Sequence, residues 1–322
     1  MEFPSIFNDV IGPVMRGPSS SHTAASWRVA NMAVQLLGGE LQRASIAFDP
    51  KGAWATNYEE QGTVLGMNGG LLQIDMAHAT MRKLPEIAQN RGVSLHYELR
   101  SFPNNHPNSM LLDLENKSGN KLRMRAASLG GGSFVIQQIN EFDVVLKGDR
   151  FVVVLWSVVD HEQEIKPYLP DHVILKRVYT KDLYLLQLES GSLFDGSFIK
   201  LLEKLPIIRI ARCNPVLPVV SGNETSPPFT SITSLIAYGA EHDFGLGELG
   251  LLYEQNRSGL DKEELLSIMN DLVVLIEQSI QKGLQGPHYT DRILHQQSHL
   301  IKKAANSGRI INDTLFNDII QN

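Results

Sequence analysis

Within residues 1–150, some apolar residues recur at the spacing of a helix and others form the short runs of strands. Together these patterns predict a mixed α+β fold. Residues 22–37 predict a helix ended by Gly38-Gly39, because apolar residues recur there at helical spacing: Val29, Met32, Ala33, Leu36 and Leu37. Residues 63–72 hold several glycines and predict either a helix packed closely on a neighbour or a loop. Strand-like runs cover residues 44–49, 95–99, 110–115 and 122–127.

The pattern changes from residue 151 onward and predicts a second, smaller domain over residues 151–214. Its apolar runs suggest the order β-α-β-β-α-β, with elements at residues 151–158, 162–169, 173–179, 183–188, 194–205 and 206–213. This order is the split βαβ, or ferredoxin-like, pattern. Modules of this kind are commonly regulatory or dimerising, but the fold alone does not fix the function.

A proline-rich linker, residues 215–228, leads to a region with a helical pattern over residues 229–322. Residues 231–255 predict one or two helices. Asp261 and Glu264 form a capping box before a long apolar-periodic helix that Gly283 ends. Another helix is predicted over residues 290–305. Because these helices lack an obvious closing element, we expect a partial helical domain whose core another chain completes.

Composition narrows the function classes. The net charge is -6 and no stripe of Lys and Arg is present, so nucleic acid is not an expected partner. No apolar run reaches the ~18–20 residues that span a bilayer, and the N-terminus lacks a signal-peptide pattern, which predicts a cytoplasmic protein without a membrane partner. The single cysteine, Cys213, ends an apolar strand, which predicts a buried thiol. Alone it holds neither an iron–sulfur cluster nor a closed zinc site.

A polar cluster lies directly before the first helix. It consists of four hydroxyl side chains and one imidazole: Ser19, Ser20, Ser21, His22 and Thr23. The unpaired amides and the dipole of a helix N-terminus favour an anion, so a carboxylate or phosphate fits here, with His22 as a proton-transfer group. The alternative is a helix cap with more serines than it needs, and the residues alone leave these two interpretations level.

Three further features are candidates for chemistry. Ser128 precedes Gly130-Gly131-Gly132, a run that predicts either an anion-binding turn or a flexible hairpin tip. His106 lies in a polar loop with Asn108, where a lone histidine is usually only a surface residue. His295 and His299 are one helical turn apart, but Gln296 stands where a zincin needs glutamate, so a metal site there is not favoured.

These motifs resemble a known family. The stretches that carry the likeness are Ile11 to Met15, Gly17 to Thr23, Gly69 to Leu72, His106-Pro107-Asn108, Ser128 and Gly130 to Gly132. Together they resemble the iron–sulfur-dependent L-serine dehydratases of the two-subunit bacterial type. The resemblance implies a β-like substrate-binding domain over residues 1–150, an ACT-like domain over 151–214, and in 229–322 only the start of the family's helical α domain.

The resemblance also implies an activity and a partner. It implies a lyase that eliminates water from L-serine or a related hydroxy-amino acid, giving pyruvate and ammonia from serine. A [4Fe–4S] cluster would be held by a cysteine-bearing α-type subunit and not by this chain. His22 and His106 would handle protons or orient the substrate, and which is the base stays open, as does homodimerisation through the β-like domain. The substrate would be bound by Ser19, Ser20, Ser21, Thr23, Asn108, Ser128, Gly130, Gly131 and Gly132.

The chain departs from the family pattern in one neighbouring stretch. Where the family has lysine, histidine and aspartate, this sequence has Glu59, Gln61 and Val64. An imidazole and a carboxylate are therefore missing, together with any proton transfer or substrate contact that they made. This loss supports an alternative hypothesis, in which the chain is a non-catalytic binding or regulatory subunit derived from the family.

Overall fold

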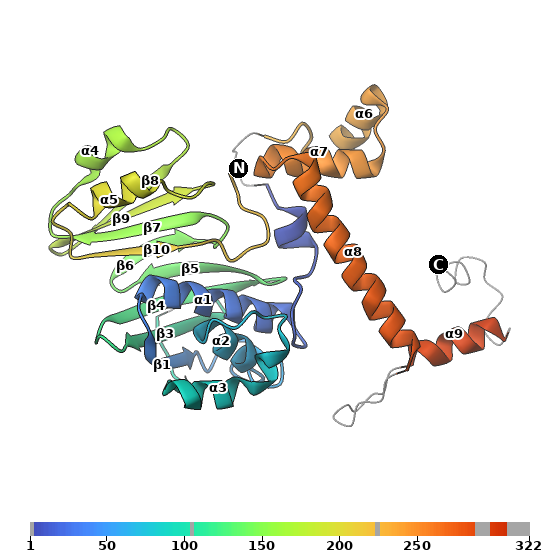
Figure 1. Ribbon diagram of the computed structural model, residues 1–322, viewed down its shortest axis with the longest axis horizontal. Coiled ribbons are helices and arrows are strands. Elements are labelled where there is room, and N and C mark those ends of the chain that lie inside the picture. The colour runs from blue at the N-terminus through green and yellow to red at the C-terminus, as the bar shows by residue number, and fades with distance from the viewer. Residues whose placement is uncertain (1–2, 104–105, 223–225, 287–296, 308–322) are drawn as a thin grey trace. The chain divides into compact units, whose positions relative to one another are not determined.

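The computed structural model describes residues 3–103, 106–222, 226–286 and 297–307 (Figure 1). The chain divides into two compact units, Met1–Gly259 and Leu260–Asn322. Helices and strands are mixed in the first unit, as an α+β fold requires, and the described residues of the second unit are helical. The predicted domain limits at residues 150 and 214 fall inside the first unit and stay a prediction.

The first unit is built on a mixed sheet of six strands in the order β2-β1-β3-β4-β5-β6. The pair β1 and β2 is parallel and the other neighbours are antiparallel. A parallel pair needs a long crossover, which α2, the 3₁₀ turn Ala79–Lys83 and α3 supply here. The strands are β1 (Leu41–Phe48), β2 (Ser94–Leu99), β3 (Ser109–Asn116), β4 (Lys121–Gly130), β5 (Ser133–Ile139) and β6 (Phe142–Leu146).

Three helices accompany this sheet: α1 (Ala25–Leu37), α2 (Thr63–Leu71) and α3 (Leu84–Arg91). The helices α1 and α2 lie side by side (Figure 1). Their approach explains the glycines of α2, since a Cβ at Gly66 would lie 2.0 Å from the Thr23 carbonyl oxygen. A Cβ at Gly70 would lie 2.2 Å from the carbonyl oxygen of Trp27. The glycine-rich stretch is therefore the closely packed helix, the first of the two predicted alternatives.

The second sheet has the strand order β10-β7-β9-β8, with every neighbouring pair antiparallel. Its elements follow one another as β7 (Phe151–Ser157), α4 (Glu162–Ile165), β8 (Ile174–Thr180), β9 (Leu183–Ser190), α5 (Gly196–Leu202) and β10 (Arg209–Cys213). A short 3₁₀ turn, Lys166–Tyr168, extends α4. The predicted β-α-β-β-α-β order is thus observed, and the ACT-like assignment stays a prediction.

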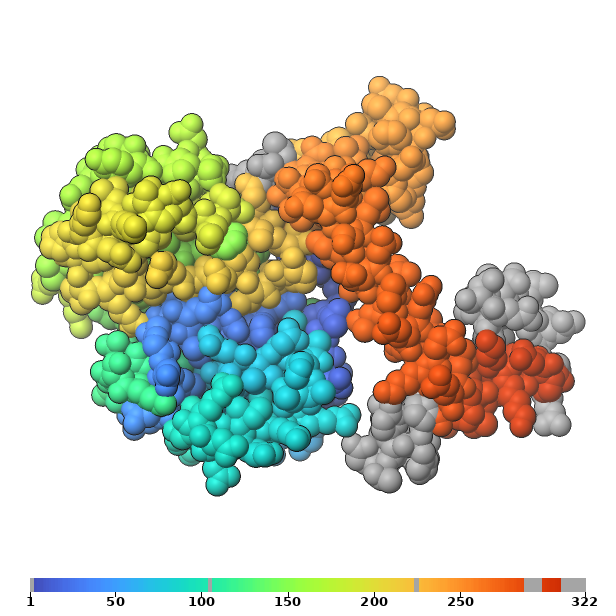
Figure 2. Space-filling model, viewed as in Figure 1, coloured from blue at the N-terminus to red at the C-terminus, as the bar shows by residue number. Residues whose placement is uncertain are grey.

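The two sheets share one hydrophobic core. Buried side chains of the first sheet, of α1 and of the second sheet belong to one cluster, represented by Met124, Leu36 and Val154. Accordingly, α1 contacts β4, β5 and β10. The other face of the second sheet packs on α5 through a separate cluster that includes Leu188 and Phe198. In the space-filling view, the yellow and green segments of this region form one continuous surface (Figure 2). Because α1 lies between two buried surfaces, the turn at its N-terminus is held in a fixed place.

Four described helices follow the linker: α6 (Ile232–His242), α7 (Leu246–Ser258), α8 (Lys262–Leu284) and α9 (Ser298–Asn306). The predicted capping box is present, because Asp261 accepts the Glu264 amide at 2.8 Å and Glu264 accepts the Asp261 amide at 2.9 Å. Of the helix predicted over residues 290–305, the part before residue 297 lies outside the described residues. Among the described helices, none is both long and apolar enough to cross a bilayer.

Candidate functional site

The hydroxyl groups of the polar cluster gather around an imidazole. Residues Ser20–Ala24 form a π-helical turn that continues into α1, and the preceding Ser19 makes no capping hydrogen bond with its side chain. Instead, the Ser19 Oγ lies 3.1 Å from the Ser21 Oγ and 3.2 Å from the His22 Nδ1. The Ser21 Oγ lies 3.3 Å from the same nitrogen. This arrangement disfavours the interpretation of the cluster as a simple helix cap.

The electrostatics of His22 suit a proton acceptor. Burial lowers the pKa of His22, and the side chain of Asn57 acts in the opposite direction as a smaller influence. Asn57 is therefore a neighbour, although Nε2 of His22 and Oδ1 of Asn57 have no hydrogen-bond partner of acceptable geometry among the described residues. The ring of Trp54 lies 5.6 Å from the ring of His22, centroid to centroid. A lowered pKa keeps the imidazole neutral near pH 7, the form that accepts a proton.

Several buried polar atoms of this region have no hydrogen-bond partner within the described chain, and four of them are His22 Nε2, Trp54 Nε1, Asn57 Oδ1 and Asn108 Oδ1. Buried polar groups in native proteins are bonded in the great majority of cases. These four atoms come from three separate segments. Two are ring nitrogens, of His22 and Trp54, and two are side-chain amide oxygens, of Asn57 and Asn108. They are available to a polar ligand that carries both donor and acceptor groups.

The loop with His106 and Asn108 is joined to the polar cluster through Ser128. The backbone amide of Asn108 donates to His106 Nδ1 at 3.1 Å, which fixes the imidazole ring against its own loop. The Ser128 amide donates to the Asn108 carbonyl at 3.1 Å, and its hydroxyl donates to the Ser21 carbonyl at 2.8 Å. Ser128 is fully buried. Residues predicted from three distant motifs therefore lie in one hydrogen-bonded network.

The glycine run forms the tip of the β4–β5 hairpin. All three residues have positive φ, 102° at Gly130, 61° at Gly131 and 95° at Gly132, which explains why side chains are absent there. The tip is packed and not free. Arg28 Nη1 donates to the Gly132 carbonyl at 2.7 Å, and a Cβ at Gly132 would lie 3.4 Å from Pro13. The tip thus lies against the start of α1 and the segment that precedes the polar cluster.

Thr23 is placed differently from the serines. It is fully buried, and its hydroxyl donates to the Gln61 carbonyl at 3.3 Å. A Cβ at Gly17 or at Gly62 would lie 2.4 Å from that hydroxyl oxygen, so both glycines leave room for Thr23. Thr23 therefore ties the polar cluster to the stretch in which the family histidine is replaced by Gln61. Ser20 is partly buried on the same turn.

Sequence reasoning missed Arg28, Trp54 and Asn57 as parts of the site. For Arg28 a signal existed, because it precedes Met32 and Leu36 by four and eight residues and so places a charge on the core face of α1. Trp54 and Asn57 carry no comparable pattern, since they lie in turns between β1 and α2. Only the folded chain brings them to His22.

The described residues do not form a metal site. No group of three or more His, Cys, Asp or Glu side chains in the described ranges is arranged to hold a metal ion. Cys213 is buried, and burial raises the pKa of its thiol to about 12, so it stays protonated. His299 lies in α9, while His295 lies outside the described residues. An iron–sulfur cluster therefore does not fit the donors that this part of the chain offers.

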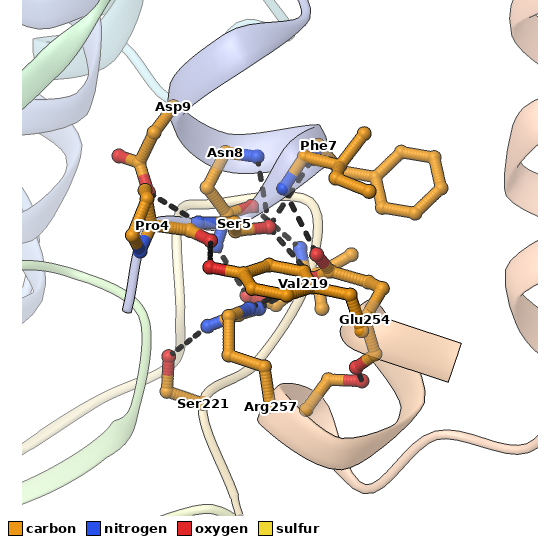
Figure 3. Close-up of polar contacts among 12 residues, drawn as sticks. Pro4, Ser5, Phe7, Asn8, Asp9, Val219, Ser221, Glu254 and Arg257 are labelled. Carbon is orange, nitrogen blue, oxygen red and sulfur yellow. Dashed lines mark hydrogen bonds and ion pairs between the residues drawn. The ribbon is translucent and has the colours of Figure 1, made fainter. Parts of the chain in front are cut away.

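The segment that precedes the polar cluster is fixed by α7 (Figure 3). Glu254, 1% exposed, accepts the Ser5 hydroxyl at 2.8 Å and the Ile6 amide at 2.9 Å. The same carboxylate pairs with Arg257 at 2.7 Å, and the Tyr253 hydroxyl donates to the Pro4 carbonyl at 2.8 Å. These contacts hold the N-terminal π-helical turn Ile6–Val10 in place.

This turn reaches the glycine tip. Asp9 Oδ1 accepts the Ser133 hydroxyl at 3.0 Å, directly after Gly132, and Asp9 Oδ2 accepts the Ser5 amide at 2.8 Å. The side chain of Asn8 makes two hydrogen bonds to the backbone of Val219 in the linker. Its Nδ2 donates to the Val219 carbonyl at 2.7 Å, and its Oδ1 accepts from the Val219 amide at 2.9 Å. Through these bonds, α7 and the linker support the segment against which the tip lies.

Comparison with known proteins agrees with the motifs. No family profile matches the chain. The chain is similar to the probable L-serine dehydratase beta chain of Bacillus subtilis (strain 168), with 29% identity over 221 residues that cover 66% of this chain and 99% of that protein. It is also similar to the L-serine dehydratase beta chain of Peptoniphilus asaccharolyticus, with 28% identity over 148 residues, 46% of this chain and 66% of that protein. The resemblance that the motifs predicted, to the beta chains of L-serine dehydratases, is thus confirmed.

Proposed function

We propose that this chain is the β-type component of a dehydratase that eliminates water from L-serine or a related hydroxy-amino acid. One observation carries the proposal most directly. The hydroxyls of Ser19 and Ser21 meet the imidazole of His22 beside unpartnered buried polar atoms of Trp54 and Asn57. Such a site offers hydroxyl donors for a carboxylate and a neutral base. The names of the two relatives point to the same substrate.

In this proposal the chain binds the substrate and moves one proton. The carboxylate of serine is bound by the hydroxyls of Ser19, Ser20 and Ser21 and by amides of the glycine tip. A neutral histidine, His22 or His106, accepts the proton from the serine Cα, and burial of His22 favours the neutral form. The electron pair released at Cα forms the C=C bond as the Cβ–O bond breaks, and the departing hydroxide takes up a proton to become water, while the protonated histidine later returns its proton to solvent. The resulting aminoacrylate is hydrolysed to pyruvate and ammonia.

Departure of the hydroxyl needs an electrophile, and the proposal assigns it to a [4Fe–4S] cluster on a cysteine-bearing partner chain. The described residues offer no donor set for such a cluster. A beta chain is by name one part of a larger assembly, which supports a partner. A further support is the apolar surface of α8, where five side chains are between 42% and 54% exposed: Val273, Val274, Leu275, Ile276 and Ile280.

A second function remains a candidate because of one specific observation. Gln61 and Val64 replace a family histidine and aspartate, and the carbonyl of Gln61 accepts the Thr23 hydroxyl within the polar cluster. In the alternative, the chain is a binding or regulatory subunit that keeps the amino-acid site without the chemistry. The two functions differ in whether bound L-serine is consumed.

The test is anaerobic purification of the tagged chain expressed together with its neighbouring genes. The proposed function predicts a brown assembly with a cysteine-bearing chain, which releases equal amounts of pyruvate and ammonia from L-serine. Of the two variants His22→Ala and His106→Ala, the one that removes the base should reduce the rate at least about 100-fold, the low end of what a general base contributes. His96→Ala, which removes an exposed histidine on β2, is the matched control. An assembly that binds L-serine but stays inert after cluster reconstitution would establish the alternative.

A further inference from the structure

The most unusual charged residue of the first unit is Arg28. Its side chain is only 1% exposed, and its one direct hydrogen bond in the described chain runs from Nη1 to the Gly132 carbonyl, at 2.7 Å. The Nε–H is buried without a partner, and no carboxylate of the described residues lies within ion-pair distance. Burial lowers the pKa of Arg28 to about 10, and the charge of Asp9 acts in the opposite direction.

Arg28 is also in an unfavourable position within its helix. It lies on the same face of α1 as the buried side chains of Met32 and Leu36, where a charge is removed from water. A buried guanidinium needs a counter-charge and several acceptors, and here one carbonyl oxygen is the only acceptor found in the described residues. Protein stability alone does not account for such a residue. Its one bond is made to the glycine tip, the part of the proposed site assigned to the substrate carboxylate.

The second charge of this region is Asp9. It is exposed, and it bonds the Ser133 hydroxyl at the end of the glycine tip, so it faces the same backbone from the N-terminal turn. Its negative charge partly offsets Arg28 and opposes any anion bound at the tip. The interior of a protein screens charges weakly, so the buried charge of Arg28 acts on a ligand at the tip without touching it, whereas the exposed charge of Asp9 acts more weakly.

We propose that Arg28 determines the specificity of the site for ligands that carry a carboxylate, by placing a buried, incompletely compensated positive charge behind the Gly130–Gly132 tip. The negative charge of Asp9 partly offsets that of Arg28 and so sets the net electrostatic attraction between the tip and the ligand. The proposal rests on the proposed function in naming a hydroxy-amino acid as the ligand. Arg28 and Asp9 act through the tip, and we do not place either of them on the reacting atoms.

The test compares L-serine with L-serinamide, which lacks the carboxylate charge, and with acetate, which carries only that charge. Binding to the purified assembly is followed by tryptophan fluorescence, because Trp54 lies beside His22. Wild type should bind L-serine at least about tenfold more tightly than L-serinamide. Arg28→Met should remove this preference. Arg28→Lys should keep part of it, since the lysine ammonium retains the positive charge but lacks the planar guanidinium.

Asp9→Asn provides a variant that keeps the fold. An asparagine amide still bonds both the Ser5 amide and the Ser133 hydroxyl, so only the charge is lost. The proposal predicts that Asp9→Asn binds L-serine and acetate about threefold more tightly, as expected for one nearby charge, with L-serinamide unchanged. Asp143→Asn is the matched control, because it removes a carboxylate on β6 that is 82% exposed. It should change the binding of none of the three ligands.

Each outcome decides one claim. If Asp9→Asn weakened the binding of all three ligands equally, Asp9 would only support the tip. If the wild type bound L-serine and L-serinamide with equal affinity, the role of Arg28 would be overturned. An assembly that binds acetate in an Arg28-dependent manner, but neither serine compound, would overturn the proposed function and leave the role of Arg28 standing. Binding of none of the three would overturn both.

Discussion

Glu254 offers the sharpest test of how the site is held, because its carboxylate joins two segments that are 249 residues apart in the chain. Replacing Glu254 by alanine removes the acceptor of the Ser5 hydroxyl and of the Ile6 amide. It also leaves Arg257, 7% exposed, without its ion-pair partner. The N-terminal turn and α7 are then no longer joined through this carboxylate.

The expected loss of stability is large. Breaking a buried ion pair by removing one partner costs ~3–5 kcal/mol, chiefly because the remaining charge stays buried. Arg257 keeps one neutral acceptor, the Ser221 hydroxyl at 2.9 Å, which compensates little of that cost. We therefore expect Glu254→Ala to lower the free energy of unfolding of the first unit by about 3 kcal/mol or more. The isosteric Glu254→Gln should lose less, because its amide oxygen still accepts one of these bonds.

Urea unfolding followed by tryptophan fluorescence measures this directly, since all three tryptophans, Trp27, Trp54 and Trp156, belong to the first unit. The control is Glu40→Ala, which breaks an ion pair with Lys117 whose side chains are 77% and 52% exposed. Exposed pairs contribute ~0–1 kcal/mol, so the control should change little. If Glu254→Ala were no more destabilising than Glu40→Ala, the buried pair would not hold the N-terminal turn, and our account of how α7 supports the site would be wrong.

Three further predictions concern single residues. Cys213 should react with a thiol reagent at pH 8 only after unfolding, because burial raises its pKa to about 12; rapid labelling of the native chain would contradict its placement in β10. Gly70→Ala should destabilise the first unit by ~1–3 kcal/mol, since a Cβ would lie 2.2 Å from the Trp27 carbonyl oxygen; a stabilised variant, measured by urea unfolding, would refute the close approach of α1 and α2. The lowered pKa of His22 means that folding favours the neutral ring, so its contribution to stability is present above pH 6.5 and is lost as the pH falls below that ordinary value. His22→Gln should therefore flatten the decline of unfolding free energy below pH 6.5, and an unchanged decline would argue against the partial burial of His22.

Local patterns predicted most of the elements because each pattern is set by near neighbours in the chain. The apolar period of residues 22–37 gave α1, and the order of apolar runs after residue 151 gave the strands of the second sheet. The Asp261 capping box marked the start of α8 correctly, since both of its bonds join residues three positions apart. The glycines of residues 63–72 left two alternatives, because only contact with α1 decides between a helix and a loop.

The site was predictable only in part. The motifs supplied Ser19 to Thr23, His106, Asn108, Ser128 and the glycine run, and the structure joins many of them through Ser128. The motifs did not supply Trp54 or the support from Glu254, because those contacts depend on tertiary structure and leave no local period. The serine cluster shows the same limit, since whether Ser19 caps the helix or faces His22 depends on the geometry of the turn.

A crystal structure of the assembled protein with L-serine would show directly where this site binds the amino acid. We predict that the serine carboxylate lies within hydrogen-bonding distance of the Ser19–Ser21 hydroxyls and the Gly130–Gly132 amides, with Cα next to His22 or His106. A serine bound elsewhere, or one bound here with its carboxylate turned away from the glycine tip, would contradict this placement of the substrate.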